Sequence, residues 1–396
     1  MAESKYLVPM SSPEIDESDR QAVLDVLRTT FLSIGPRVIE FEKSICAYSG
    51  ARHAIAVNSG TSGLHLCLRA AGIQPGDLVL TTPFSFVSST NVILYENAIP
   101  VFVDVDPASG NIDVKKLAEA AADLSSGSEE RARKWLPRTG AESHGKLRAI
   151  LAVDVFGQPA DYDAIRQIAH QYNLKLIEDS CEALGAEYKG KRAGLFGDYG
   201  VFAFYPNKQI TTGEGGIIVT DDDQAAEYMA SLRNQGRAQG DTWLQHTHLG
   251  YNYRLDEMSS ALGVSQMNRI DELIDRRNRV AQLYNRRLAA IQNIELPYVG
   301  PETTRMSWFV YVIRTKAPLQ RDRFAADLEA EGIPVRPYFL PIHLQPYIAE
   351  KFGCREGDFP VTEDLGRRGL ALPFSSCMTE DQVALVCDKI EKCAAV

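Results

Sequence analysis

The sequence predicts an α/β protein with a mostly parallel sheet in a large domain and a smaller α+β domain at the C-terminal end. Two observations lead to this fold class. Short apolar strands alternate with helical stretches from His53 to Thr220, which is the pattern of a parallel sheet. A long, charged helical stretch, Glu257–Ile291, then leads into a region of mixed strands and helices. We therefore predict domains at residues 1–265 and 266–396.

The composition is that of an ordinary globular protein, with 396 residues of which 45% are hydrophobic and 24% charged. Its net charge of −10 argues against nucleic acid or an anionic membrane as a partner. No apolar run reaches the roughly 20 residues of a membrane span, and the start, Met1–Met10, lacks a signal-peptide pattern. The seven scattered cysteines have no metal spacing and indicate free thiols. We expect a cytoplasmic protein.

Capping residues and apolar spacing define the first elements. Ser12 followed by Pro13 predicts a helix start, and an apolar stripe over residues 38–48 predicts a second helix. The run His53–Val57 predicts a strand, and the small polar turn Asn58–Gly63 leads from it into a helix. Such a turn either holds a phosphate on free backbone N–H groups or is an ordinary turn with a hydroxyl cap.

Further strands end in polar or aromatic residues, at the edge where parallel α/β sheets bind ligands. These strands are predicted at residues 78–80, 101–105, 149–155 and 174–179. Phe86 lies in the loop after the first of them. Asp179 ends the last one, where it either pairs with a ring nitrogen or caps a helix. The polar, basic segment 124–147 is interpreted as a surface insertion, with contact to a partner or a nucleotide as the alternative.

The most unusual stretch surrounds Lys208. A buried strand is predicted at Val201–Phe204, followed by a Pro-Asn-Lys turn, a glycine-rich loop and a second apolar strand, Ile217–Thr220. Lys208 is thus a single cation in an apolar or small-residue segment. A buried lysine is unfavourable unless it is paired or modified, and a desolvated amine readily forms a Schiff base with an aldehyde cofactor. The alternative is a loop lysine that points into water.

After this stretch, the polar-aromatic turn Gly250–Asp256 precedes the long helical region. Alternation predicts a strand at Trp308–Ile313, and apolar spacing predicts helices at Phe324–Glu331 and Asp381–Ile390. These elements make up the α+β domain.

Taken together, these features supply what pyridoxal 5′-phosphate (PLP) requires. The phosphate needs the hydroxyl-rich helix start near Thr61, and the ring needs an aromatic face such as Phe86. The ring nitrogen needs a carboxylate such as Asp179, and the aldehyde needs Lys208. The combination is far more specific than any one member of it.

With these motifs the sequence resembles the PLP-dependent nucleotide-sugar aminotransferases of DegT–DnrJ type, on the fold-type I aminotransferase scaffold. The resemblance covers nearly the whole chain and implies a three-layer large domain. The segments that carry it are Asn58–Leu66, Thr82–Val87, Phe156–Asp161, Ile177–Asp179, Tyr205–Lys208, Gly213–Gly216, Tyr251–Arg254 and His343–Tyr347.

The resemblance implies a role for each candidate cofactor residue. Lys208 is expected to be the Schiff-base lysine and Asp179 the partner of the pyridine nitrogen, and these two are the expected catalytic residues. Contacts to the phosphate and ring of PLP are expected from Gly60, Thr61, Ser62, Phe86 and Gln158.

The resemblance also implies a homodimer with shared active sites, in which Asn252 and Arg254 reach the cofactor site of the neighbouring subunit. Substrate contacts are expected from Glu182, Arg254 and His343.

Three positions depart from the commonest pattern of the family. Ala203 stands where a phosphate-binding serine is frequent, and Asp154 where histidine is common. Glu182 stands where glutamine or histidine is usual, as in some perosamine-synthase-like members. These departures bear on the substrate pocket more than on the core chemistry.

The implied activity is transfer of an amino group from L-glutamate to a nucleotide-linked keto-deoxysugar, for amino-sugar or surface-polysaccharide biosynthesis. Glu182 favours a GDP-linked 4-keto-6-deoxy sugar. One alternative is a sugar dehydratase of the same family, but such enzymes typically carry histidine in place of Lys208. The other alternative is a non-catalytic PLP-binding regulator.

Overall fold

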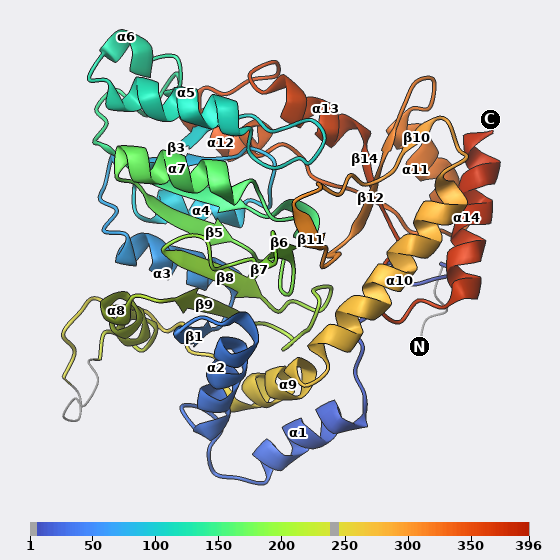
Figure 1. Ribbon diagram of the computed structural model, residues 1–396, viewed down its shortest axis with the longest axis horizontal. Coiled ribbons are helices and arrows are strands. Elements are labelled where there is room, and N and C mark those ends of the chain that lie inside the picture. Colours follow the sequence, from blue (N-terminus) through green and yellow to red (C-terminus); the bar gives the residue numbers. More distant parts are fainter. Residues whose placement is uncertain (1–5, 238–244, 396) are drawn as a thin grey trace.

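Seven strands form the central sheet of the large domain, in the order β1-β9-β8-β5-β4-β2-β3 (Figure 1). The computed structural model describes residues 6–237 and 245–395. All strands of this sheet run parallel except β9, which is antiparallel to its neighbours β1 and β8. The prediction of a mostly parallel sheet is confirmed. The strands are β1 (His53–Val57), β2 (Leu78–Thr81), β3 (Ile99–Phe102), β4 (Leu147–Val153), β5 (Lys175–Asp179), β8 (Tyr199–Ala203) and β9 (Gly216–Thr220).

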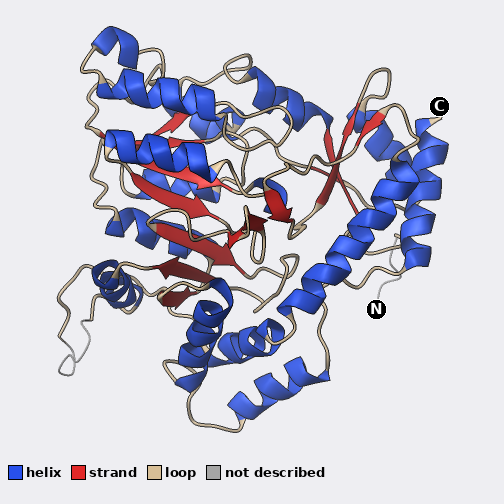
Figure 2. Cartoon of the chain, in the orientation of Figure 1, coloured by secondary structure: helices blue, strands red, loops and turns tan. Residues whose placement is uncertain are grey.

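Helices cover both faces of this sheet and complete three layers (Figure 2). In β4, Leu151 and Val153 pack into the core shared with α3, α4 and α8, whereas Ile150 and Ala152 pack into the core shared with α5 and α7. Successive side chains of a strand point to opposite faces, so a strand covered on both sides is apolar throughout. The helices are α2 (Pro36–Ser49), α3 (Gly60–Ala70), α4 (Ser88–Tyr95), α5 (Val114–Ser125), α7 (Tyr162–Tyr172) and α8 (Asp223–Arg233).

The smaller domain is built on an antiparallel sheet in the order β10-β12-β14-β13. Its strands are β10 (Ile294–Glu295), β12 (Tyr311–Thr315), β13 (Arg336–Pro337) and β14 (Gly369–Leu372), and its helices include α11 (Arg321–Ala330) and α14 (Glu380–Ala394). The chain enters through α9 (Glu257–Met267) and α10 (Ile270–Leu288). Leu273 of α10 packs in a core of the large domain and Tyr284 in that of the small domain, so α10 bridges the two (Figure 1). The boundary at 265/266 stays a prediction.

Short elements complete the described chain. They are α1 (Glu17–Leu27), α6 (Glu129–Ala132), η1 (Val155–Gly157), β6 (Glu187–Tyr188), β7 (Lys191–Arg192), β11 (Thr303–Arg305), η2 (Ile342–Leu344), α12 (Pro346–Phe352) and α13 (Pro360–Arg368). The strands β11, β6 and β7 form a third, small sheet.

Several predicted element boundaries differ from the structure. The strands predicted at 101–105 and 149–155 end at Phe102 and Val153, and the long helical region is divided into α9 and α10. Two further differences have a clear local cause. The first helix begins at Glu17 rather than after Ser12, because Asp16 caps it and forms a capping box with Asp19. The strand predicted from Trp308 begins at Tyr311, because Trp308 has a φ of 53°, which is not an extended conformation.

The N-terminal segment before α1 belongs in space to the small domain. The N–H of Leu7 donates to the carbonyl of Gly332, and the N–H of Phe374 donates to that of Met10. Val8 is buried in the small-domain core. The chain therefore passes from the small domain to the large one before α1, which a division at a single boundary does not capture.

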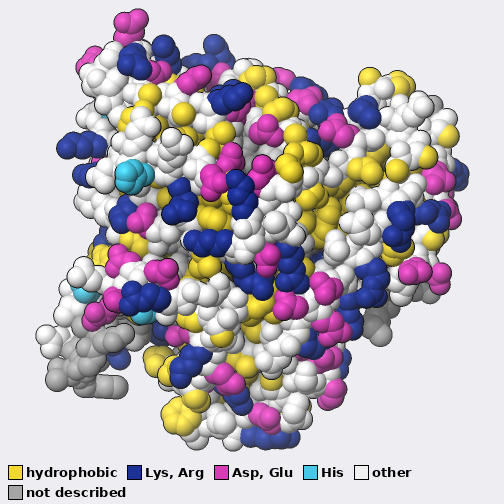
Figure 3. All heavy atoms as spheres, viewed as in Figure 1, with side chains coloured by type: hydrophobic (Ala, Val, Ile, Leu, Met, Phe, Trp, Pro, Cys, Tyr) yellow, Lys and Arg dark blue, Asp and Glu magenta, His cyan; other side chains and the backbone are white. Residues whose placement is uncertain are grey.

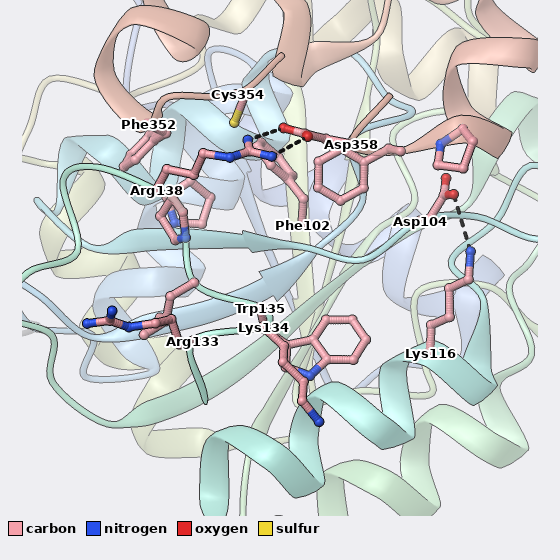
Figure 4. A pocket seen from close by; sticks show the side chains of 15 residues that line it. Phe102, Asp104, Lys116, Arg133, Lys134, Trp135, Arg138, Phe352, Cys354 and Asp358 are labelled. Atoms are coloured by element: carbon pink, nitrogen blue, oxygen red, sulfur yellow. Dashed lines mark hydrogen bonds and ion pairs between the residues drawn. The ribbon is translucent and has the colours of Figure 1, made fainter. Parts of the chain in front are cut away.

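The segment 124–147 is not wholly a solvated insertion. Trp135 and Leu136 pack against a core of the large domain, and Arg138 makes a two-pronged ion pair with Asp358 at 2.5 and 2.6 Å. The segment lines a cavity of about 380 Å³ together with residues before α13 (Figure 4). Arg138 already pairs with Asp358 of the same chain, so this ion pair connects the two segments that line the cavity.

Charged side chains of both signs are interspersed over the face of the molecule seen in Figure 3. Within the part of the chain that the structure describes, no helix has both the length and the apolar composition needed to cross a membrane.

A buried carboxyl group, that of Asp154, follows β4 directly. It accepts hydrogen bonds from the hydroxyls of Tyr162 at 2.7 Å and Ser180 at 2.6 Å, and from the N–H of Ala160 at 3.0 Å. Asp154 is fully buried, and this burial raises its pKa from 3.8 to about 7. A carboxyl group with a raised pKa in the folded state destabilises the protein as the pH rises through the window between the two values.

The variant Asp154→Asn should remove this pH dependence. Relative to wild type, we expect its free energy of unfolding to gain about 1–3 kcal/mol between pH 5 and pH 8, because one pKa unit corresponds to about 1.4 kcal/mol. Urea unfolding of both proteins at the two pH values measures this. At pH 5 the carboxyl group is neutral in the folded state, so pH 5 serves as the reference. An equal difference between variant and wild type at both values would contradict the prediction.

Candidate active site

A cavity of about 410 Å³ opens at the carboxyl ends of the central strands, between the two domains. Six of the predicted site residues line it, namely Gly60, Thr61, Phe86, Asp179, Glu182 and Lys208. Three aromatic residues that follow α10 also line it, namely Phe309, Tyr338 and Phe339.

The first turn of α3 forms one wall of this cavity. Ser59 is the N-cap, and its hydroxyl accepts a hydrogen bond from the N–H of Ser62 at 3.1 Å. The N–H groups of Gly60 and Thr61 lie in the first turn, where a helix offers them no carbonyl, so they are available to an anion. A Cβ atom on Gly60 would lie 2.7 Å from the sulfur of Cys181, which explains the glycine. This geometry favours the phosphate-binding interpretation of the turn.

Ser62 itself faces away from the cavity. Its side-chain hydroxyl donates to Asn58 Oδ1 at 2.6 Å, and the residue is buried. Its contribution to the turn is to hold the loop before α3, and any contact to a phosphate would come from its neighbours.

Lys208 projects into the cavity from the turn after β8. Its Nζ lies 3.6 Å from Glu182 Oε1 and 3.8 Å from the centre of the Phe309 ring, and only 13% of the side chain is exposed. The N–H of Lys208 donates to the carbonyl of Tyr205, which closes the turn. The burial excludes the alternative of a loop lysine in water.

Asp179 lies at the end of β5 with both carboxylate oxygens engaged. Oδ2 accepts from the hydroxyl of Ser89 at 2.6 Å, and Oδ1 accepts from the N–H of Cys181 at 3.3 Å. Ser89 belongs to α4 and also contacts the hydroxyl of Ser85 at 2.9 Å. Sequence reasoning missed Ser89, although two serines four residues apart, one in the aromatic loop and one in the helix that follows it, were a usable signal.

Glu182 stands between Lys208 and the backbone of η1. Its Oε2 accepts from the N–H of Phe156 at 2.9 Å. Burial raises the pKa of Glu182, and the neighbouring charge of Lys208 opposes that rise. Burial likewise raises the pKa of Tyr338 to about 12, with a further contribution from Glu182. Sequence reasoning also missed Phe309, Tyr338 and Phe339, because only the docking of the domains brings them to the site.

Gln158 and His343 do not line this cavity, and their expected roles stay predictions. Gln158 is buried, its Oε1 accepts from the N–H of Gly300 at 2.8 Å, and it lines a different cavity of about 330 Å³. His343 is fully buried, with Nε2 2.9 Å from Glu363 Oε1. Each side chain is held by a neighbour that draws it away from the cavity lined by Lys208, so neither faces that cavity.

The turn with Asn252 and Arg254 lies beside the phosphate turn rather than in the cavity. The N–H of Asn58 donates to the carbonyl of Tyr253 at 2.9 Å. Arg254 donates to Asn234 Oδ1 at 3.1 Å, and the side chain of Asn252 is exposed. The two residues thus lie next to the site without lining it within one chain.

Comparison with known proteins identifies the family. The sequence profile of the DegT/DnrJ/EryC1/StrS aminotransferase family matches residues 13–391. The chain is 37% identical to GDP-perosamine synthase of Caulobacter vibrioides over 390 residues, 97% of this chain and 98% of that protein.

Solved structures agree with the sequence match. DesV of S. venezuelae, in complex with a ketimine intermediate, has a TM-score of 0.84 and 31% identity, covering 96% of this chain and 94% of DesV. PseC of Helicobacter pylori, an aminotransferase involved in pseudoaminic acid biosynthesis, has a TM-score of 0.86 and 28% identity, covering 98% of this chain and 99% of PseC.

Enzymes of this family depend on PLP, and the donor set of the cavity fits that cofactor. Free N–H groups at the start of α3 suit a phosphate, the hydrogen-bonded carboxylate of Asp179 suits a ring nitrogen, and the buried Lys208 suits an aldehyde. The chain is therefore a PLP-dependent aminotransferase and belongs to the DegT/DnrJ/EryC1/StrS family.

Proposed function

We propose that the chain transfers the amino group of L-glutamate to the keto group of a nucleotide-linked deoxysugar. The observation that carries this proposal is the cluster of Lys208, Glu182 and Asp179 around one cavity between the domains. Relatives named for sugar transamination support the class of acceptor.

PLP, when bound, supplies an electron sink for the charge that develops at the α-carbon of the donor. In the proposed arrangement, the N–H groups of Gly60 and Thr61 bind its phosphate. Asp179, fixed by Ser89, holds a proton on the ring nitrogen. The side chain of Phe86 covers the cofactor ring. Phe86 is itself exposed, so the cavity is open to solvent on this side.

Lys208 is proposed as the acid–base group of the reaction. Its Nζ removes the proton from the α-carbon of the donor and returns a proton to the carbon of the sugar that receives nitrogen. Glu182 Oε1, at 3.6 Å, keeps Nζ on one side of the cavity, and the Phe309 ring limits its movement on the other. Two successive half-reactions at one lysine predict ping-pong kinetics.

Glu182 is proposed to recognise the sugar substrate. One of its oxygens is fixed by the backbone of Phe156, so the other remains to accept hydrogen bonds from sugar hydroxyls when Lys208 moves. The name of the Caulobacter relative supports a GDP-linked 4-keto-6-deoxy sugar.

A homodimer with shared sites is also part of this proposal. The exposed side chain of Asn252, next to the phosphate turn, supports a contact that crosses to a second copy. Arg254 is held by Asn234 on the same surface.

The reaction and the role of Lys208 can be tested together. Wild-type protein with PLP, L-glutamate and a GDP-linked 4-keto-6-deoxy sugar should form the amino sugar, identified by mass spectrometry and NMR. Lys208→Ala should lower the rate by about 10²–10⁴-fold and abolish covalent capture of PLP by borohydride, because no other group replaces the lysine. Lys189→Ala, which changes an exposed lysine paired with Asp163, is the control and should behave as wild type. Transfer by Lys208→Ala at the control rate would refute the assignment.

The role of Glu182 makes a separate prediction. Glu182→Gln keeps the shape but removes the charge, so we expect about a 10-fold loss or more in kcat/KM for the sugar, with the L-glutamate half-reaction close to wild type. Single-turnover absorbance changes, recorded with the sugar alone and with L-glutamate alone, measure the two half-reactions separately. Equal losses in both half-reactions would show that Glu182 serves the cofactor site instead.

The shared site predicts complementation between two inactive variants, Lys208→Ala and Asn252→Ala/Arg254→Ala. If the two variants are unfolded together and reassembled, one site of a mixed dimer contains all three substitutions and the other site contains none. Random pairing makes about half of the dimers mixed, so roughly a quarter of wild-type activity should return. If each site were built within one chain, no activity would return. Each variant refolded alone provides the baseline.

A further inference from the structure

Arg277, on α10, is a buried arginine beside the active site. Only 2% of the residue is exposed, and among the described residues its hydrogen bonds all go to main-chain carbonyls and none to a carboxylate. A charge taken out of water requires other polar partners. Arg277 finds them in main-chain carbonyl groups.

Four carbonyl oxygens surround its guanidinium. Nη2 donates to the carbonyls of Asn207 at 3.2 Å and Lys208 at 2.5 Å. Nη1 donates to the carbonyls of Trp308 and Phe309, both at 3.2 Å. One planar group therefore ties the turn that carries Lys208 to the segment that carries the Phe309 ring.

These two segments meet again at Lys208 Nζ, which lies 3.8 Å from the centre of the Phe309 ring. Arg277 binds the backbone carbonyls of both residues, so it fixes the distance between the two segments on the side away from Lys208 Nζ and the Phe309 ring. A second link lies next to it, since Gln209 Nε2 donates to the carbonyl of Glu182 at 2.6 Å and to the hydroxyl of Ser307 at 3.0 Å.

The backbone that Arg277 holds is strained at one point. Trp308 has a φ of 53°, a conformation that a bulky side chain rarely adopts. Its indole N–H donates to Asn278 Oδ1 at 3.1 Å. Arg277 and Asn278 thus fix the carbonyl and the side chain of Trp308, which turns the next residue, Phe309, towards Lys208.

Burial lowers the pKa of Arg277 to about 10, which leaves the group charged at neutral pH. An ammonium group cannot replace it, because lysine offers three donors from one point whereas arginine offers a planar fork. The geometry thus requires arginine in particular, and not only a positive charge.

We propose that Arg277 is a positioning residue that sets the place of Lys208 Nζ against Phe309 and Glu182 by binding four backbone carbonyls. This inference rests on the proposed role of Lys208 as the group that captures PLP.

The test uses Arg277→Lys, Arg277→Met and a control on the same helix. Tyr284→Phe removes a buried hydroxyl in the small-domain core, which donates to the carbonyl of Pro373 at 2.8 Å and lies 3.9 Å from Met378 Sδ. The first measurement is hydrogen exchange of the cofactor-free protein at the amides of Lys208 and Phe309, which bond to the carbonyls of Tyr205 and Phe156. The second is the rate at which PLP is captured at Lys208, followed by borohydride trapping and peptide mass.

Both Arg277 variants should speed exchange at these two amides by at least about 10-fold and slow capture by about 10- to 100-fold. Tyr284→Phe should lower the melting temperature and change neither quantity. Wild-type exchange and capture in the Arg277 variants, or equal changes in Tyr284→Phe, would overturn the proposal. So would an Arg277→Lys protein that does not fold, because the residue would then serve fold stability. If wild type captured PLP at another lysine, the role of Lys208 would fail, and exchange would still decide whether Arg277 fixes the two segments.

Discussion

The site depends on the burial of one ammonium group between two domains. Lys208 Nζ has a carboxylate of the large domain, that of Glu182, on one side and an aromatic ring that the chain supplies after α10, that of Phe309, on the other. A buried cation needs both a partner charge and a fixed position, because water no longer screens or solvates it. The short turn after β8, the docking of the two domains and the polar groups behind the lysine all meet this one requirement.

The sequence predicted the parts of the fold that local chemistry controls. The apolar runs of β4, β5, β8 and β9 and the small polar turn before α3 have patterns that neighbouring residues determine. Asp179 was predicted at the ligand-binding edge of the sheet because it ends a strand, and Lys208 and the start of α3 were predicted to join it because the three together supply what PLP requires. Phe86 was predicted with them as the aromatic face for a ring, the family resemblance added Glu182, and the cavity includes both.

What could not be predicted arises from contacts between distant segments. Phe309 and Tyr338 reach the cavity only because the small domain docks there, and no local pattern marks them. His343 is drawn into a buried pair by Glu363, twenty residues further along the chain. Trp308 alternates with its neighbours as a strand would, but a positive φ turns it out of that geometry. Arg277 is one of several arginines on a charged helix, and burial alone distinguishes it from the others.

The path of the N-terminal segment has a mechanical consequence. Residues 7–10 pack on the small domain before the chain reaches α1, and α10 leads back to it. After β13 the chain packs on the large domain again, through Ile342, Ile348 and Leu365, before it returns to β14, so more than two covalent connections join the domains. Each additional connection further restricts how one domain can move relative to the other. Any closing of the domains over the cavity would therefore have to bend several connections of the main chain at once.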